Sequence, residues 1–158
     1  MSNYVDQSVL KSLYSSLIYP HLTYAIELWG ASARTQLNSL RSLQNRSVKY
    51  LRNYPTEPLN SVYTNNRLFK LEQIHHFYTT IKFFKYLDDD RFFLNTKLQS
   101  SQTYHTHNTR FTYNNNFRMS SIGVSRYYSS FYYQSIKFYN DLPIAIRESY
   151  NIYSFNPL

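Results

Sequence analysis

The chain has 158 residues, which suits one domain, or one helical domain with a smaller appendage. It carries no cysteine, and this excludes disulfides, thiolate zinc sites and zinc knuckles. Seventeen lysines and arginines against nine acidic residues give a net charge of +8. This balance favours a polyanionic partner, either DNA, RNA or an anionic membrane surface, and the alternative is a protein that is merely basic.

The aromatic content is high, with 18 tyrosines, 11 phenylalanines and one tryptophan. Aromatic rings placed among lysines and arginines can stack on unpaired bases. An AT-rich coding bias also raises the counts of Tyr, Phe and Asn, and we give this bias the larger share. No segment reaches the length of a membrane-spanning helix and no signal peptide is recognisable, so we expect an intracellular protein of the nucleus or cytoplasm that does not bind membranes.

The first elements in chain order are expected to be two helices. Asp6 is placed to cap a helix that begins at Gln7. Pro20 is expected to break or kink this helix, because proline lacks an amide proton and its ring clashes with the preceding turn. A second short helix is predicted around Leu22 to Trp29, ending at Gly30.

A third helix, predicted over residues 35–53, separates apolar from basic residues. One arc of its wheel holds the apolar residues Leu37, Leu40, Leu43, Val48 and Leu51. The other side holds the basic residues Arg34, Arg41, Lys49 and Arg52, with Arg46 beside them. No acidic residue occurs between Ala31 and Thr56, whereas an ordinary solvated face normally mixes both signs of charge. The pattern therefore predicts contact with phosphates.

The remaining elements indicate a mainly α fold with a small β-containing C-terminal part. A long amphipathic helix is predicted over residues 68–87. Polar residues dominate 95–120, residues 122–139 suit one or two short strands, and a last helical turn follows Leu142-Pro143. The predicted domains are a helical domain over 1–94, an irregular linker over 95–120, and strands with a terminal helix over 121–158.

Five segments, in this order, resemble the region that follows the palm in reverse transcriptases of non-LTR retrotransposons. They are Leu13 to Tyr24 with Leu28-Trp29-Gly30, Leu40 to Val48, Leu68 to Glu72, His105 to Arg110, and Ser130 to Pro143. The first resembles the L-Y-x-S-L-I-x-P-H-L-x-Y…W-G stretch of the thumb. The chain departs from the family near its end, where Ser135-Ile136 replaces Gly-Pro and Tyr139 replaces Trp.

The resemblance implies a thumb-like helical bundle that grips nucleic acid along its backbone, without the catalytic part of the polymerase. It assigns this contact to Arg34, Arg41, Arg46, Lys49 and Arg52. It also implies the palm of a parent polymerase as a partner, and it places Pro20, His21 and Trp29 in the packing of the thumb. The alternative is a structural or protein-interaction module, or an inert relic, whose exposed apolar face docked on that palm.

No catalytic residue, metal or cofactor is expected. Tyr86-Leu87-Asp88-Asp89 imitates the aromatic-x-Asp-Asp signature of polymerases, but it ends a predicted helix and lacks an upstream partner aspartate, so we interpret Asp88 to Asp90 as a solvated helix end. His75 and His76 are neighbours on a helix and cannot share a face, while His105 and His107 lack a third ligand. With Gly30 and Gly123 as its two glycines, the chain has no glycine-rich phosphate loop.

Overall fold

The computed structural model describes residues 5–87, 98–99, 116–119 and 123–147, and the statements that follow concern these residues. Over these ranges the chain is mainly helical and forms no strand, which confirms the predicted mainly α class. The chain divides into two compact units, residues 1–78 (unit 1) and 79–158 (unit 2), and each is described by itself.

Unit 1 begins with one helical run that consists of α1 (Gln7–Leu13), the π-helical turn η1 (Tyr14–Ile18) and α2 (Tyr19–Thr23). Asp6 holds the predicted N-cap position, but its carboxylate accepts a hydrogen bond from the Ser8 hydroxyl rather than from a backbone amide. In η1 the amide of Tyr19 donates to the carbonyl of Tyr14, five residues earlier. The disturbance predicted at Pro20 is this wider turn, and the helix continues past the proline.

The second predicted helix is divided at a left-handed residue. Ala25 has a φ of 49°, and α3 (Ile26–Trp29) starts directly after it. Trp29 Nε1 donates to the carbonyl of Tyr24 over 2.7 Å, which ties the short helix to the turn before it. The helix ends at Gly30 as predicted. A methyl group at Gly30 would lie 2.4 Å from the His75 ring, so the glycine allows a close approach that alanine would block.

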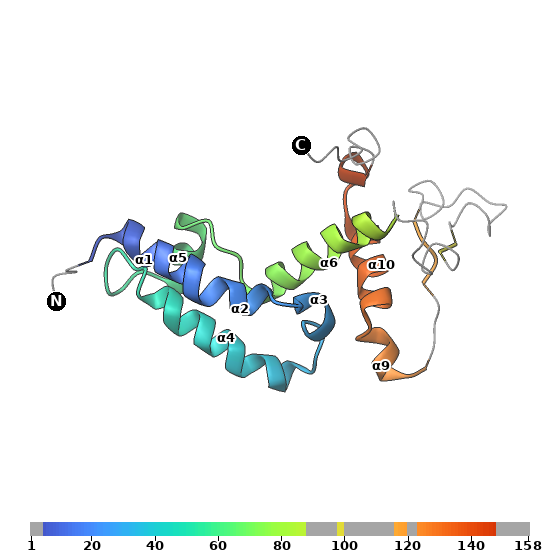
Figure 1. Cartoon of the computed structure of the whole chain (residues 1–158), viewed down its shortest axis with the longest axis horizontal. Coiled ribbons are helices and arrows are strands. Elements are labelled where there is room, and N and C mark those ends of the chain that lie inside the picture. The colour runs from blue at the N-terminus through green and yellow to red at the C-terminus, as the bar shows by residue number, and fades with distance from the viewer. Residues whose placement is uncertain (1–4, 88–97, 100–115, 120–122, 148–158) are drawn as a thin grey trace. The chain divides into compact units, whose positions relative to one another are not determined.

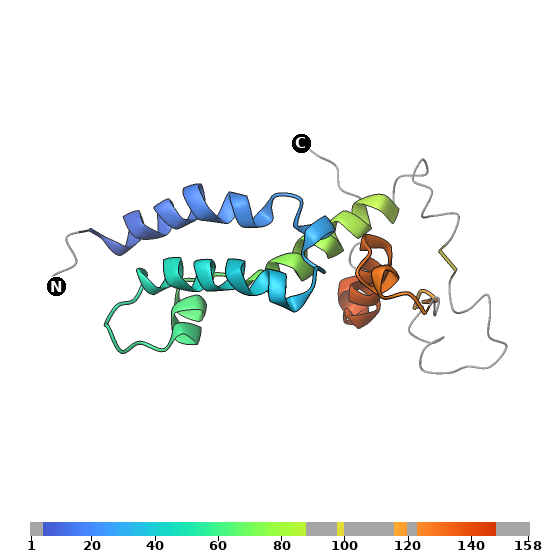
Figure 2. The same cartoon turned by 90° about the horizontal axis from the view of Figure 1, so that it is seen from below.

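The predicted basic helix is α4 (Arg34–Lys49), which begins one residue before and ends four residues before the predicted range of 35–53. Figures 1 and 2 show it alongside the first helical run, with α5 (Leu59–Asn65) against its C-terminal end. α6 (Leu71–Leu87) matches the predicted long helix except for its first three residues. Because α6 crosses the boundary between the units, its residues up to Tyr78 are described with unit 1.

Two apolar clusters hold unit 1 together. The first consists of Tyr14, Val48, Leu51, Val62 and Tyr63, and the second of Leu22, Ile26, Leu71 and Ile74. Ile18 and Tyr19, around the end of η1, pack against both clusters. The helical run, α4, α5 and the first turns of α6 therefore fold as one helical bundle around these side chains.

Gln44 is a buried polar residue that joins three segments of unit 1. Its Nε2 donates to the Tyr14 hydroxyl (3.1 Å) and to the Phe69 carbonyl (2.9 Å). Its Oε1 accepts from the amide of Leu71 (3.0 Å), the first residue of α6. Gln44 thereby satisfies buried backbone groups and fixes α4 against the start of α6.

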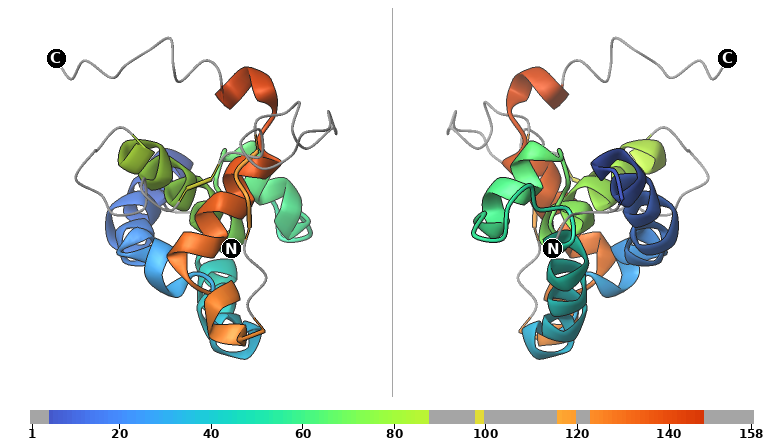
Figure 3. Two further views of the ribbon diagram at one scale, coloured as in Figure 1. Left: turned by 90° about the vertical axis from the view of Figure 1, so that its right-hand side faces the viewer. Right: turned by 90° about the vertical axis from the view of Figure 1, so that its left-hand side faces the viewer.

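In unit 2 the predicted short strands over residues 122–139 are wrong, because this segment forms α9 (Ser125–Tyr128) and α10 (Phe131–Asp141). Figure 3 shows the two helices following one another along the orange part of the chain. Ser130 caps α10 by accepting from the amide of Tyr133, and the buried Ser135 and Ile136 lie on one face of the helix. The β propensity of Tyr and Phe yields here to helical periodicity and capping. A helical turn follows Pro143, as predicted.

Several predictions fall outside the described residues. They concern the acidic run at 88–90, the domain boundary at residue 94, most of the linker over 95–120, and the His105 to Arg110 segment. The two compact units divide between Tyr78 and Thr79.

Candidate nucleic-acid interface

Three of the five predicted phosphate-binding residues lie exposed on one side of α4. Arg34, Lys49 and Arg46 fall within an arc of about 120° when successive residues are spaced as in an α-helix. The neighbouring arc of the helix is buried through Gln44 and Val48. One side of α4 is therefore fixed in the bundle while another presents cations to solvent.

The charges of these three residues are not offset within the bundle. Arg34, Arg46 and Lys49 form no ion pair or side-chain hydrogen bond with any residue in the described part of the chain. No acidic residue lies on α4 or in its flanking sequence from Ala31 to Thr56. Their full positive charge is therefore available to an external anion.

Arg41 lies in a different environment from the other four. Its guanidinium forms an ion pair with Glu72 on α6, with an Nε to Oε1 distance of 2.6 Å, and it also donates to Asn38 Oδ1. Partial burial acts to raise the pKa of Glu72, but hydrogen bonds from its own amide and from Arg41 outweigh this and lower the pKa. The carboxylate stays ionised and offsets the charge of Arg41, so this residue attracts phosphate less than its neighbours do.

Arg52 follows the end of α4 and is half-buried. Its Nη1 donates to the carbonyl of Pro55 over 3.0 Å, and its own carbonyl accepts from Gln7 Nε2 over 3.0 Å. Both partners are neutral, so Arg52 keeps its charge beside Lys49 while the hydrogen bonds restrict its side chain.

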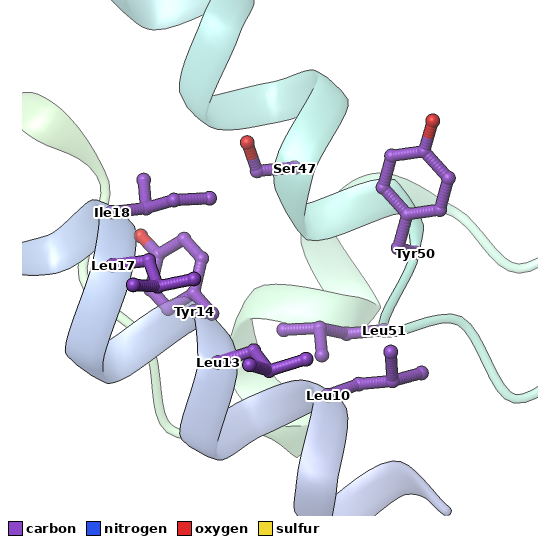
Figure 4. A pocket seen from close by; sticks show the side chains of 8 residues that line it. All are labelled: Leu10, Leu13, Tyr14, Leu17, Ile18, Ser47, Tyr50 and Leu51. Atoms are coloured by element: carbon purple, nitrogen blue, oxygen red, sulfur yellow. The ribbon is translucent and has the colours of Figure 1, made fainter. Parts of the chain in front are cut away.

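Leu43 lies on the predicted apolar arc of α4, yet 55% of its surface is exposed. It lies one turn before Ser47, on the side of α4 that faces the first helical run. A hollow of about 270 Å³ opens here, lined mainly by the apolar side chains of Leu10, Leu13, Tyr14, Leu17, Ile18, Ser47, Tyr50 and Leu51. Figure 4 shows these side chains facing one another from the two segments. We call this hollow the apolar groove.

A second, polar groove lies where α4, α5 and the start of α6 meet, and the sequence analysis missed it. It consists of two hollows of about 280 and 360 Å³ that share Asn60, Tyr63 and Lys70. Lys70 Nζ donates to Asn60 Oδ1 over 2.9 Å and lies 5.9 Å from the centre of the Tyr63 ring. The sequence signal was Lys70 beside Phe69, and the sequence analysis used these two residues only as part of the segment Leu68 to Glu72 of the family resemblance.

Neither a metal centre nor a membrane helix was found in the described ranges. No group of three or more His, Asp or Glu side chains there is arranged to hold a metal ion. Likewise, none of the helices in those ranges combines the length and apolar character needed to cross a bilayer.

Comparisons with protein families, curated proteins and solved structures found no match for this chain. The similarity to non-LTR reverse transcriptases therefore stays a prediction that rests on the sequence segments quoted above.

Proposed function

We propose that the chain binds the sugar-phosphate backbone of nucleic acid through α4, as a non-catalytic C-terminal part of a retrotransposon reverse transcriptase. The observation that carries this proposal is the exposure of Arg34, Arg46 and Lys49 on one side of α4 without any counter-charge in the described chain. Arg52 extends the positive surface past the end of the helix.

The anchoring of α4 supports the proposal, because a fixed helix holds its cations at fixed spacing. Gln44 ties α4 to η1 and α6, and Val48 is fully buried in the first apolar cluster. Binding then orders side chains on α4 but costs no entropy for ordering the backbone of the helix. Such contacts recognise phosphates and carry no sequence preference.

The test is a titration of the purified chain with labelled duplex DNA at several salt concentrations. Each phosphate neutralised on a duplex contributes a slope of about −0.9 to log K against log salt. We expect the double substitution Arg46→Ala with Lys49→Ala to reduce the slope by about 1.8 and to weaken binding at low salt.

The matched control is Lys11→Ala with Lys85→Ala, which removes the same charge from two exposed lysines that do not belong to α4. It should change the slope less than the α4 variant does. Equal losses in both variants would show that net charge alone attracts the DNA. A folded chain that binds no DNA at low salt would contradict the proposal.

The apolar groove favours a second candidate function, docking on the palm of the parent polymerase. Leu17 and Tyr50, on opposite sides of the groove, expose 62% and 76% of their surface. Arg46 borders Leu43 and Tyr50 on the wheel of α4, so the groove suits an apolar ridge flanked by carboxylates. The partner we infer is a palm surface of this kind.

This second function is tested with separately produced fingers and palm domains of a non-LTR reverse transcriptase. Addition of the chain should restore primer extension, and Leu17→Ser should abolish the restoration without changing duplex binding. Restoration that is equally strong with Leu17→Ser, or no restoration at all, would contradict docking through this groove.

A further inference from the structure

The connection between α5 and α6 places an arginine in a conformation that favours glycine. The amide of Leu68 donates to the Tyr63 carbonyl (2.8 Å) and that of Arg67 to the Thr64 carbonyl (3.1 Å). These two bonds form a Schellman motif, in which the residue after the C-cap takes the left-handed conformation. That residue is Arg67, with a φ of 55°.

An arginine in this left-handed conformation is strained, whereas a glycine would be relaxed. The advantage of arginine over glycine at this position must therefore come from its side chain. Leu68 packs against the first apolar cluster, so the backbone that carries Arg67 is held on both sides. The exposed guanidinium has no side-chain partner among the described residues. The motif thus holds a free cation at a fixed place beside the polar groove.

The larger hollow of the polar groove combines this cation with an aromatic face. Its volume is about 360 Å³, and its lining includes Arg67, Phe69, Lys70, Asn60 and Gln73. Phe69 exposes 42% of its surface, and the ring of Phe77 packs against its ring at a centroid distance of 5.6 Å. Gln73 Oε1 accepts from the amide of Lys70 (2.9 Å), which fixes the backbone between Phe69 and α6.

The local charge also favours an anion. Arg41, Arg67 and Lys70 bring three positive charges to the two hollows, and Glu72 is the one acidic residue among their described lining residues. Arg41 forms the ion pair with Glu72 and Lys70 adds a weaker attraction to it, so the lining keeps a positive balance of three cations to one carboxylate. Lys70 is positioned by Asn60, on α5, so its ammonium group lies at the edge of the hollow.

An exposed ring between two cations matches one nucleotide of an unpaired strand. A base offers its face to a ring only when it is unstacked, and the phosphates on either side of it attract lysine and arginine. The bases of a duplex are stacked on each other and cannot reach Phe69. We propose that the polar groove binds one unpaired nucleotide of single-stranded nucleic acid, its base stacked on Phe69 and its phosphates at Arg67 and Lys70. This inference rests on the proposed function and adds a preference for single strands.

The experiment compares the full chain with Phe69→Ala, Phe69→Tyr and Arg67→Gly, using fluorescence anisotropy with a labelled single-stranded oligonucleotide and a duplex of equal length. Phe69→Ala should weaken single-strand binding about tenfold and leave duplex binding unchanged, and Phe69→Tyr should retain the affinity because it keeps the ring. Arg67→Gly should lower the single-strand salt slope by about 0.7.

Arg67→Gly separates binding from folding, because relief of the left-handed strain keeps or raises Tm while the cation is lost. The matched control is Ala25→Gly, at the other non-glycine residue with positive φ among those described. It gives the same backbone relief without a change in charge, and it should leave both affinities unchanged.

The outcomes distinguish this inference from the proposed function. Equal effects of Phe69→Ala on single strands and duplex, or no effect on either, would overturn the nucleotide site while the α4 variants still report on backbone binding. Adenosine monophosphate is the further probe. Free adenosine monophosphate is compared with unlabelled oligonucleotide as a competitor at equal nucleotide concentration. If the two compete equally well, the assignment to a strand is overturned, whereas much weaker competition by the free nucleotide supports it.

Discussion

The two units of the molecule use their aromatic residues in different ways. In unit 2 the rings of Phe83, Phe117 and Tyr139 pack against one another with centroid distances of 5.0 to 6.0 Å. Arg147 lies 5.4 Å from the Tyr139 ring, and its Nη1 donates to the buried Asn116 over 2.7 Å. In unit 1 the buried clusters are largely aliphatic, and aromatic rings such as Phe69 remain exposed.

This difference shows that a high aromatic count does not by itself indicate a surface for bases. The rings that unit 2 contributes to its core contact each other, and Phe83 among them is fully buried. In unit 1, buried polar groups such as Gln44 and Glu57 connect the segments. Glu57 accepts from the Asn53 amide (2.8 Å) and from Asn65 Nδ2 (2.9 Å), which closes the loop between α4 and α5. Aromatic rings of unit 1 are thus available beside its cations.

The largest effect is expected from Phe83→Ala in the aromatic cluster of unit 2. Phe83 is fully buried, and its truncation should lower the free energy of unfolding by about 4 kcal/mol. Chemical denaturation measures this loss, and hydrogen exchange should show faster exchange in α10. Duplex binding through α4 should persist. A loss of binding as large as that of the Arg46 and Lys49 variant would break the separation of roles between the units.

A smaller effect is expected from alanine at the two glycines, one in each unit. A methyl group at Gly30 would lie 2.4 Å from His75 Cδ2 and 2.6 Å from the Ile26 carbonyl, so Gly30→Ala should cost about 3 kcal/mol. Gly123→Ala is the matched control in unit 2, because nothing lies within 4 Å of its added methyl group. Urea unfolding of both variants tests the contrast, and equal stabilities would show that unit 1 is less tightly packed at Gly30 than described.

The smallest effect concerns the pH dependence of unit 1 through His75. Burial, with a contribution from the neighbouring His76, lowers the pKa of His75 from 6.5 to about 4, against the opposing influence of Glu27. Between these values the unfolded chain binds more protons than the folded chain, so the free energy of unfolding should decrease as pH falls from 6.5 to 4. The decrease should be on the order of 2 kcal/mol.

His75→Gln removes this titration with little change in side-chain size. Urea unfolding of both proteins at pH 7 and pH 4.5 measures the difference, since the carboxylates protonate in both. Because the variant lacks this titration, it should lose less stability on acidification than the parent chain. An identical pH dependence of the two proteins would mean that the His75 ring is protonated inside the fold.

Sequence periodicity predicted the helices well but not what each face contacts. The ranges of α4 and α6 were predicted to within a few residues, because long amphipathic segments carry a repeated signal. The short strands were wrong because aromatic β propensity was given more weight than the Ser130 cap. The exposure of Leu43 was not predictable, since a wheel shows which residues share a face and not which partner covers that face.

The candidate site was predicted only in part for the same reason. The exposed positions of Arg34, Arg46 and Lys49 follow from their place on the wheel. The ion pair between Arg41 and Glu72 depends on how α4 meets α6, which no local pattern encodes. Gln44 resembles an ordinary polar helix residue until its three partners from other segments are known. The left-handed conformation of Arg67 could not be predicted from the sequence either, because glycine usually marks such a position and is absent here.

The π-helical turn at Tyr14–Ile18 has a consequence for sequence comparison. The π-helical turn contains one residue more than an α-helical turn, and this extra residue sets the direction of the later side chains around the helix axis. In this orientation Ile18 and Tyr19 contact both apolar clusters. Loss of a single residue here would turn the next side chains by about 100° around the helix axis. Homologous chains should therefore align without gaps between Tyr14 and Leu22, whereas insertions and deletions should gather in the loop between α4 and α5.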